Sequence, residues 1–364
     1  MKYFNFVAKH WKQILVYPIV LCLLFVASCS FFNFLLVPAK NSSIVEAVMT
    51  EAKNEDENID MIFFGSSRTY RGINSYALSN NLNKNIFNIA YERATFLTNY
   101  YLLKELYKTN KPEAVFIEIS TASFLRDKGS EDIYAYQTLT GENKTEFAEV
   151  AELEYHELSL LDFTNYLDNF SNEKFIQNVK LKFKGEYDIC DTVRGGDKID
   201  YHGKGFLGVD KSVNDNKHLS LPLSYGSTEE WEEEKVNTLQ FEYLEKIINF
   251  CKSHNITVYL YCTPFPYYIT NEMLNVFSGF DEYIKENFTS KGIEYIDFAK
   301  IKKSLITLNN SCFYDGNHCN LHGANEIAPI LANVISDLEN NTYNSQNYFY
   351  DTFQDMINDY EIII

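Results

Sequence analysis

The sequence predicts an α/β protein with a mainly parallel central sheet. Short apolar segments without polar alternation recur along the chain, which is typical of strands that are buried on both faces. Segments with the apolar spacing of helices lie between them. Of the 364 residues, 46% are hydrophobic and 16% aromatic, a composition that supports a large core and excludes a disordered chain.

The first half of the sheet is expected between residues 59 and 119. Three continuous apolar segments predict strands, at residues 59–64, 85–90 and 114–119. Between the second and third, residues 94–107 have apolar side chains at helical spacing, and Pro112 lies beyond the end of this helix. These elements predict the strand–helix order of a parallel sheet that is covered on both faces.

The alternation of strands and helices resumes after residue 225. Thr228 is expected to cap a helix whose first turn is acidic, because carboxylates favour the positive end of a helix dipole. The apolar positions of this helix fall on one face: Val236, Leu239, Tyr243, Ile247 and Phe250. Further elements are predicted at residues 256–262 (strand), 271–288 (helix), 292–298 (strand) and 323–338 (helix). Pro329 predicts an irregularity in the last helix.

The chain divides into four expected parts. Residues 1–40 form a cytoplasmic stub and a membrane anchor, residues 41–58 a polar linker, residues 59–339 the α/β domain, and residues 340–364 a tail. Residues 126–225 are acidic and contain several glycines. They predict an insertion over the carboxyl edge of the sheet, where such folds bind ligands, with an independent domain as the alternative. The tail is either a helix that packs back or a contact for a partner.

The expected anchor is the uncharged apolar segment at residues 14–37. As a helix it is long enough for the hydrocarbon core of a bilayer, which is roughly 30 Å thick. Lys2, Lys9 and Lys12 precede it, so the positive-inside rule predicts a single-pass protein of the cell membrane. The N-terminus is then cytoplasmic and the α/β domain extracytoplasmic. A cleaved lipoprotein signal ending at Cys29 is the alternative.

The charge of the chain excludes one class of partner. The formal net charge is −18, and all 50 acidic residues follow residue 40. This acidity argues against nucleic acid or an anionic membrane surface as the main partner, so no nucleic acid is predicted as a partner.

Two short motifs carry the candidate chemistry. Gly65, Ser66 and Ser67 follow the first predicted strand directly, and Asp315 and His318 lie just before the last predicted helix. A serine, a histidine and an aspartate can act together as nucleophile, general base and orienting carboxylate. A plain turn remains the alternative for the glycine and serines, because these residue types dominate turns. Ser66 is the alternative nucleophile.

Together these motifs resemble those of the SGNH (GDSL-type) hydrolases and acyltransferases. In that family a G-D-S motif follows the first strand, here G-S-S, and a D-x-x-H motif precedes the last helix, here D-G-N-H. The resemblance implies a three-layer, flavodoxin-like sandwich. It also implies Ser67 as nucleophile, His318 as general base and acid, and Asp315 as the partner of His318. No cofactor and no metal are expected, although His322 with Asp315 and His318 allows a metal site as an alternative.

The family's oxyanion-binding motifs match less well. Its second block maps to residues 88–93, with Arg93 where glycine is usual, and a backbone N–H survives that change. Its third block has Ala122 in place of an asparagine, so Thr121 or Ser123 is expected to replace that donor.

The residues that follow the nucleophile suggest a second set of substrate contacts. Arg68 and Tyr70 are expected to face an anionic or glycan substrate, with an ordinary helix start as the alternative.

The segment N-L-H-G-A after His318 resembles the membrane-anchored branch of the family. That branch includes the D-alanyl-transfer protein of teichoic acid synthesis and accessory proteins of glycan O-acetylation. The resemblance implies a serine acyltransferase or esterase acting on ester-linked acyl groups, O-acetyl above all, of an envelope glycan or teichoic polymer. A membrane-bound O-acyltransferase is the implied partner. A non-catalytic accessory or binding protein with the same fold is the alternative.

Overall fold

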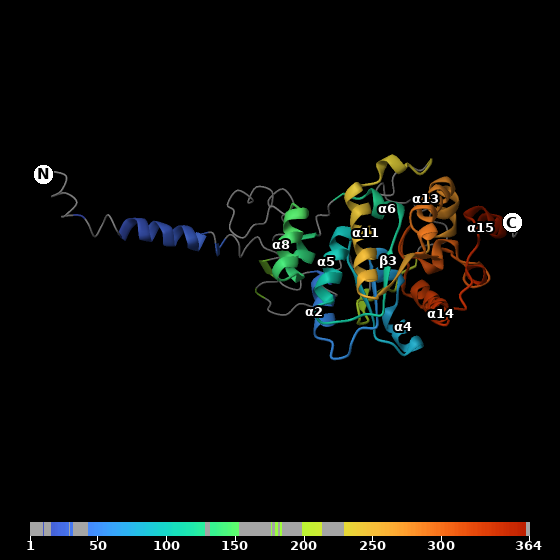
Figure 1. Ribbon diagram of the computed structural model, residues 1–364, viewed down its shortest axis with the longest axis horizontal. Coiled ribbons are helices and arrows are strands. Elements are labelled where there is room, and N and C mark those ends of the chain that lie inside the picture. Colours follow the sequence, from blue (N-terminus) through green and yellow to red (C-terminus); the bar gives the residue numbers. More distant parts are fainter. Residues whose placement is uncertain are drawn as a thin grey trace. The chain divides into compact units, whose positions relative to one another are not determined.

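The structure is a computed structural model (Figure 1). It describes residues 43–127, 132–152, 199–212 and 229–361, together with 10, 16–28, 30–31, 176, 179–180 and 183. The chain divides into two compact units, residues 1–42 with 152–187 and residues 43–151 with 188–364. The sheet and the candidate site lie in the second unit, to which the following paragraphs refer unless they state otherwise.

Five parallel strands form the central sheet, in the order β2-β1-β3-β6-β7. Their bounds are Met61–Gly65 (β1), Ile86–Ala90 (β2), Ala114–Glu118 (β3), Thr257–Cys262 (β6) and Glu294–Asp297 (β7). Counted along the chain the order is 2-1-3-4-5, a doubly wound order in which ligands bind where the winding reverses, outside β1 and β3. The predicted α/β class, the parallel sheet and its five strands are confirmed.

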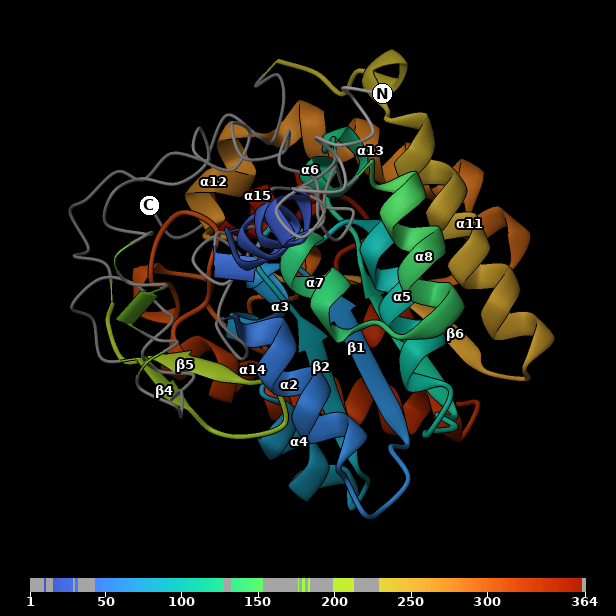
Figure 2. The same cartoon turned by 90° about the vertical axis from the view of Figure 1, so that its left-hand side faces the viewer.

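Helices cover both faces of the sheet. The helices α5 (Phe96–Leu106) and α11 (Thr238–Ser253) pack together on one face, and α4 (Ser75–Leu82) packs with α14 (Leu321–Glu339) on the other. Figure 2 shows α5 and α11 on one side of β1 and α4 on the other. The other helical elements around the sheet are α3 (Ser67–Gly72), α6 (Thr121–Leu125), α12 (Tyr267–Glu272), α13 (Leu274–Asn287), η5 (Thr289–Lys291), η6 (Phe298–Lys300) and η7 (Asn310–Cys312).

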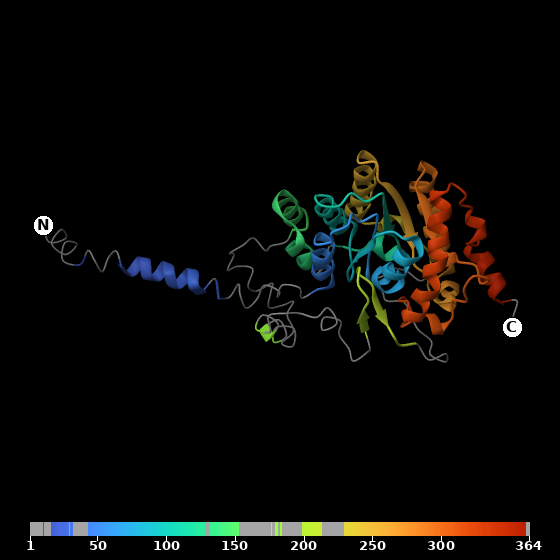
Figure 3. The same cartoon turned by 90° about the horizontal axis from the view of Figure 1, so that it is seen from below.

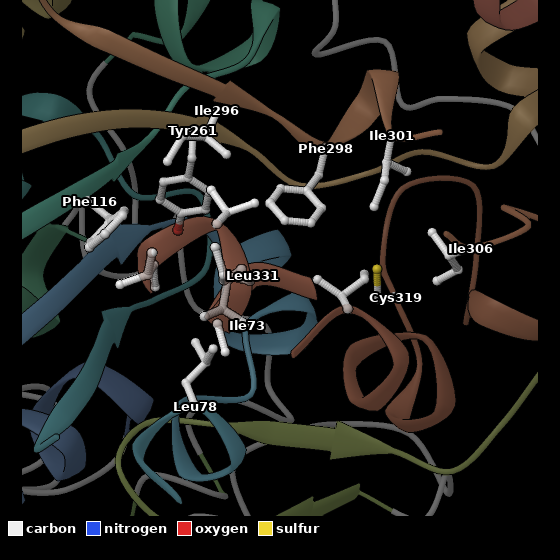
Figure 4. Close-up of a cluster of buried hydrophobic side chains, with 14 of the residues drawn as sticks. Ile73, Leu78, Phe116, Tyr261, Ile296, Phe298, Ile301, Ile306, Cys319 and Leu331 are labelled. Carbon is white, nitrogen blue, oxygen red and sulfur yellow. The ribbon is translucent and has the colours of Figure 1, made fainter. Parts of the chain in front are cut away.

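The core between the sheet and α14 is rich in aromatic residues (Figure 4). The rings of Phe63 and Phe116, on neighbouring strands, stack with their centroids 4.4 Å apart, and Tyr261 meets Phe63 edge to face. Leu331 of α14 is fully buried in the same cluster. These contacts pack β1, β3 and β6 against the middle of α14.

The expected linker at residues 41–58 is instead part of the domain. It contains α2 (Ile44–Lys53), whose helix starts at Ser43, where the hydroxyl accepts a hydrogen bond from the Glu46 N–H. Its apolar side chains are buried: Ile44, Val45, Val48, Met49 and Ala52. Their spacing of three and four residues gives one apolar face, which the polar residues between them obscured in the sequence.

Two helix boundaries differ from the prediction. The acidic residues that were expected in the first turn of α11 lie before this helix. Some of them form the short 3₁₀ turn η4 (Glu233–Lys235). The side chain of Asn237 accepts hydrogen bonds from two N–H groups of α11 and so fixes a later start. Thr228, the expected cap, lies outside the described residues. The predicted helix at 271–288 is divided at Met273 into α12 and α13.

The insertion contains α7 (Asp132–Thr138), α8 (Gly141–Val150) and a hairpin of β4 (Ile199–Tyr201) and β5 (Leu207–Val209). Figure 3 shows the two hairpin strands side by side. The tail forms η8 (Ser345–Asn347) and α15 (Phe353–Glu361). The Tyr360 hydroxyl accepts a hydrogen bond from the Leu308 N–H, so the tail packs back onto the domain.

The expected anchor lies partly outside the described residues. Residues 16–28 are helical, and their large apolar side chains are exposed. Among the residues that the structure describes, none of the helices has the length and apolar character needed to cross a membrane. The anchor stays a prediction.

Candidate active site

The structure brings Ser67, His318 and Asp315 into one chain of hydrogen bonds. The Ser67 Oγ lies 2.7 Å from Nε2 of His318, and the His318 Nδ1 lies 2.8 Å from Oδ2 of Asp315. Ser67 is the first residue of α3, immediately after β1, and the other two residues lie in the loop before α14. The arrangement therefore stands at the carboxyl end of the sheet, where doubly wound folds bind ligands.

The loop of Asp315 and His318 turns back on itself. The Tyr314 N–H donates to the carbonyl of His318 at 2.8 Å, and Phe313 and Cys319 pair as an antiparallel bridge. The Asp315 Oδ1 also accepts from the N–H groups of Asn317 and His318, each at 2.9 Å. This closed turn is why an aspartate and a histidine only three positions apart can meet through their side chains.

Asp315 is held in its charged form. Burial alone would raise the pKa of its carboxyl. The hydrogen bond and the charge of His318, together with the two backbone N–H groups, outweigh burial and lower the pKa below its usual value. A carboxylate here keeps the Nδ1 proton on the histidine, so that Nε2 faces the serine as an acceptor.

Glu118 supports the turn that carries the serines, and sequence reasoning missed it. Its Oε2 accepts hydrogen bonds from the N–H of Ser66 (2.6 Å), the hydroxyl of Ser66 (2.7 Å) and the hydroxyl of Thr69 (2.8 Å). Glu118 ends β3 and is buried. The available signal was a single acid at the end of an otherwise apolar strand. Because the Ser66 hydroxyl is bound to Glu118, Ser67 is the serine that meets His318.

Arg68 is a structural residue, so its expected role in facing the substrate is wrong. It is 2% exposed, and its guanidinium lies 3.7 Å from the centroid of the Phe265 ring. Nη2 donates to the carbonyls of Thr263 and Pro264, and Nη1 lies 3.9 Å from Oε1 of Glu118. Tyr70 is also buried, and its ring lies beside Arg71.

The three expected oxyanion donors, Arg93, Thr121 and Ser123, differ in their surroundings. Arg93 has an exposed side chain and a φ of 57°, a left-handed conformation that explains why glycine suits this position. In the described part of the chain, its N–H donates no backbone hydrogen bond. Ser123 forms a capping box with Ser120, in which its Oγ accepts from the Ser120 N–H, so its expected role as a donor stays a prediction. The Thr121 hydroxyl is buried without a hydrogen-bond partner among the described residues.

Described residues of the insertion contact the elements that carry the candidate site, since β5 packs against α3 and α14. The turn of its hairpin lies along the edge strand β2, where the carbonyl of Lys204 accepts from the N–H of Asn88. Beyond β5, the Ser212 hydroxyl accepts from the side chain of Asn320 at 3.1 Å. The Nζ of Lys211 lies 5.4 Å from the centroid of the Tyr314 ring. Residues 211–212 therefore contact the loop of Asp315 and His318.

The metal alternative gains no support from the described residues, among which no group of three histidine, cysteine or acidic side chains could hold a metal ion. His322 lies on α14 with its side chain exposed.

Gly65, the last residue of β1, leaves room for the side chains of Thr69 and Glu118 directly before the two serines. A Cβ added at this position would lie 2.0 Å from the Thr69 hydroxyl and 2.6 Å from Glu118. Gly65→Ala is therefore expected to destabilise the protein by about 1–3 kcal/mol, as overpacking does, and to displace Ser67. Urea denaturation and ester hydrolysis would measure the two effects. A Gly65→Ala variant as stable and as active as the parent would contradict the explanation.

Glu118→Gln removes the charge that faces Arg68 and weakens the hydrogen bonds to Ser66. Breaking a buried ion pair costs on the order of 3 kcal/mol, so we expect a loss of stability of this size and a lower rate of ester cleavage. Thermal unfolding and hydrolysis rates would measure both. The matched change Glu286→Gln, at an exposed position of α13, should alter neither. A Glu118→Gln variant that is as stable and active as the parent would exclude a supporting role.

Comparison with known proteins gives little further information. No protein-family model matches the chain, and no curated protein sequence matches it. Among solved structures, the chain is similar to a protein from Bacteroides fragilis that is described as a "putative acylhydrolase". The identity is 11%, the match covers 81% of this chain and 94% of that chain, and the TM-score is 0.36. Nothing below depends on so distant a likeness.

Proposed function

We propose that the protein is a serine acyltransferase or esterase of the SGNH type that acts on ester-linked acyl groups. One observation carries the proposal: the hydrogen-bonded chain from Ser67 through His318 to Asp315 at the carboxyl end of β1. A hydroxyl whose proton can pass directly to an oriented imidazole is an activated nucleophile.

In the proposed reaction the Ser67 Oγ attacks the ester carbonyl carbon while its proton passes to Nε2 of His318. The tetrahedral intermediate collapses, and the leaving alcohol takes that proton, which leaves an acyl ester on Ser67. An acceptor hydroxyl then attacks this ester and gives its proton to His318, and the proton returns to Ser67. If the acceptor is water, the same steps give hydrolysis.

The negative oxygen of the intermediate requires donors. The backbone N–H groups of Ser67 and Arg93 are the proposed ones, because neither donates a backbone hydrogen bond within the described part of the chain. Thr121 is a side-chain candidate, since its hydroxyl has no partner among the described residues. Removing one such donor typically costs about 10²–10³ in rate, so a two-donor site is slower than a three-donor site and still catalytic.

The proposed acceptor is a polymer of the cell envelope, a glycan or a teichoic polymer, and the proposed acyl group is acetyl. A single-pass anchor at residues 14–37, with a cytoplasmic N-terminus, would hold the extracytoplasmic domain near the bilayer. The exposed apolar side chains of residues 16–28 favour such a location. A membrane-bound O-acyltransferase that delivers acyl groups is the proposed partner.

Transfer and hydrolysis can be distinguished directly. The full-length protein in detergent would be given an acetyl ester with and without an envelope glycan, and acetylated glycan and free acetate would be measured. Transfer predicts acetylated glycan at the expense of acetate. Acetate alone, at the same rate with and without glycan, would make the protein an esterase.

A non-catalytic accessory protein is the second candidate. It is favoured by the third-block position, where Ala122 supplies no polar side chain and Ser123 takes part in a capping box. A folded protein that neither hydrolyses nor transfers any ester, and yet binds the polymer, would support this candidate.

A further inference from the structure

Arg71 is a buried cation with no counter-ion among the residues that the structure describes. The residue is 8% exposed, and its Nε and Nη1 are inaccessible and without a hydrogen-bond partner among the described residues. Its guanidinium carbon lies 4.9 Å from the centroid of the Tyr314 ring and 5.6 Å from that of Tyr70. Aromatic faces attract a cation but accept none of its N–H bonds in the way that an oxygen does. A buried charge left in this state is destabilising unless a partner is supplied.

Arg68 on the same helix shows the contrast. It is also buried, but its guanidinium donates to two backbone carbonyls and lies 3.9 Å from the carboxylate of Glu118. The fold therefore supplies oxygen partners to the arginine that holds the site together. It supplies none to Arg71 among the described residues, which leaves N–H donors of Arg71 for an anionic ligand.

The position of Arg71 places that partner next to the reacting groups. Arg71 lies four residues after Ser67 in α3, and residues at this spacing share one side of a helix. The Tyr314 ring beside it belongs to the residue that precedes Asp315. Lys211, from the insertion, lies over the same ring with Nζ 5.4 Å from the centroid. Arg71 and Lys211 therefore both lie near the ring of Tyr314, at the edge of the candidate site. They form a local positive charge in a chain whose net charge is −18.

We propose that Arg71 binds an anionic group, a phosphate or a carboxylate, of the substrate on which Ser67 acts. The proposal rests on the proposed function, because it names the charge of the substrate of that same site. A guanidinium presents a planar set of N–H donors that fits the oxygens of either group. Lys211 adds a second positive charge. The preferred ester is therefore negatively charged, and neutral esters of the same size are poorer substrates.

Two pairs of esters test the charge and its location. One pair carries the charge on the alcohol, acetylglycerol phosphate against acetylglycerol. The other carries it on the acyl group, the monomethyl ester of succinic acid against methyl butyrate. For each pair the ratio of kcat/KM, anionic over neutral, is measured for the parent, Arg71→Met and Arg71→Lys. This ratio does not depend on the fraction of active protein. The pair whose ratio falls identifies phosphate on the alcohol or carboxylate on the acyl group.

Arg71→Met is expected to lower the ratio about 10- to 100-fold in at least one pair, which is the effect of losing a charged hydrogen bond. Its melting temperature should be equal or higher, because a buried unpaired charge is replaced by an apolar side chain. Arg71→Lys should keep part of the preference, since lysine retains the charge and loses the planar donors. Lys252→Gln, an exposed change on α11, is the control for net charge and should leave the ratio unchanged.

The outcomes separate the two proposals. If the parent cleaves none of the four esters, the proposed function fails. If the parent cleaves them and Arg71→Met leaves both ratios unchanged, the proposed function stands and the role of Arg71 is overturned. If Arg71→Met does not fold, Arg71→Lys decides: a ratio lowered at least about threefold supports the proposal, and unchanged ratios in both pairs overturn it.

Discussion

Replacing Ser67 by alanine is expected to lower the rate of ester cleavage by about 10⁵–10⁶-fold, because no other group in the chain of hydrogen bonds can form the acyl ester. The fold should be unaffected, since Ser67 is partly exposed and, among the described residues, its hydroxyl bonds to His318 alone. Initial rates on an acetyl ester, with the melting temperature measured beside them, would check both expectations.

Ser66→Ala is the matched control for Ser67→Ala. It removes the cap of α3 and one hydrogen bond to Glu118, so it is expected to cost about 1 kcal/mol of stability. It should nevertheless keep measurable catalysis. If Ser66→Ala abolished the reaction and Ser67→Ala did not, the two serines would have to exchange roles.

Asp315→Asn is expected to lower kcat by about 10⁴-fold while the loop keeps its shape. The amide oxygen of asparagine can still accept hydrogen bonds from the N–H groups of Asn317 and His318, which the carboxylate accepts now. It cannot stabilise the protonated imidazole or fix its tautomer. Kinetics on an acetyl ester would measure the loss. Asp351→Asn, an exposed change, is the control, and a loss of less than about tenfold at position 315 would exclude the proposed role.

Asp315→Asn is also expected to change how the stability of the protein depends on pH. The pKa of the Asp315 carboxyl is lowered in the folded protein, mainly by His318 acting against burial. Its stabilising contribution is therefore fully present above the usual aspartate pKa of about 3.9 and is lost as the pH falls through the lower folded value. The stability difference between the parent and Asp315→Asn should shrink as the pH falls below about 4.

The sheet could be predicted because its strands are continuously apolar, and a segment such as Met61–Gly65 has few alternatives to a buried strand. Helix boundaries could be predicted less well, because a side-chain cap decides them. At α11 the acidic residues suggested an early start, whereas Asn237 provides the cap. In α2 the apolar face is interrupted by polar residues, so a buried helix was interpreted as a linker.

The contact between Ser67 and the D-G-N-H loop could be predicted, because the serine directly follows a recognisable strand and the loop directly precedes a recognisable helix. The residues that support the site were not. Glu118 and Asn88 are polar residues inside strands, and their partners are far away in the sequence. Arg68 and Arg71 look alike in the sequence, and only packing shows that Arg68 is paired and that Nε and Nη1 of Arg71 have no partner among the described residues.

The most direct test is to treat the folded protein with a fluorophosphonate, which phosphonylates activated serines, and to locate the adduct by peptide mass spectrometry. We expect one adduct, on Ser67, that is absent from Ser67→Ala and slowed in Asp315→Asn, whose histidine is no longer oriented. No adduct on well-folded protein, or an adduct that persists in Ser67→Ala, would contradict an activated Ser67.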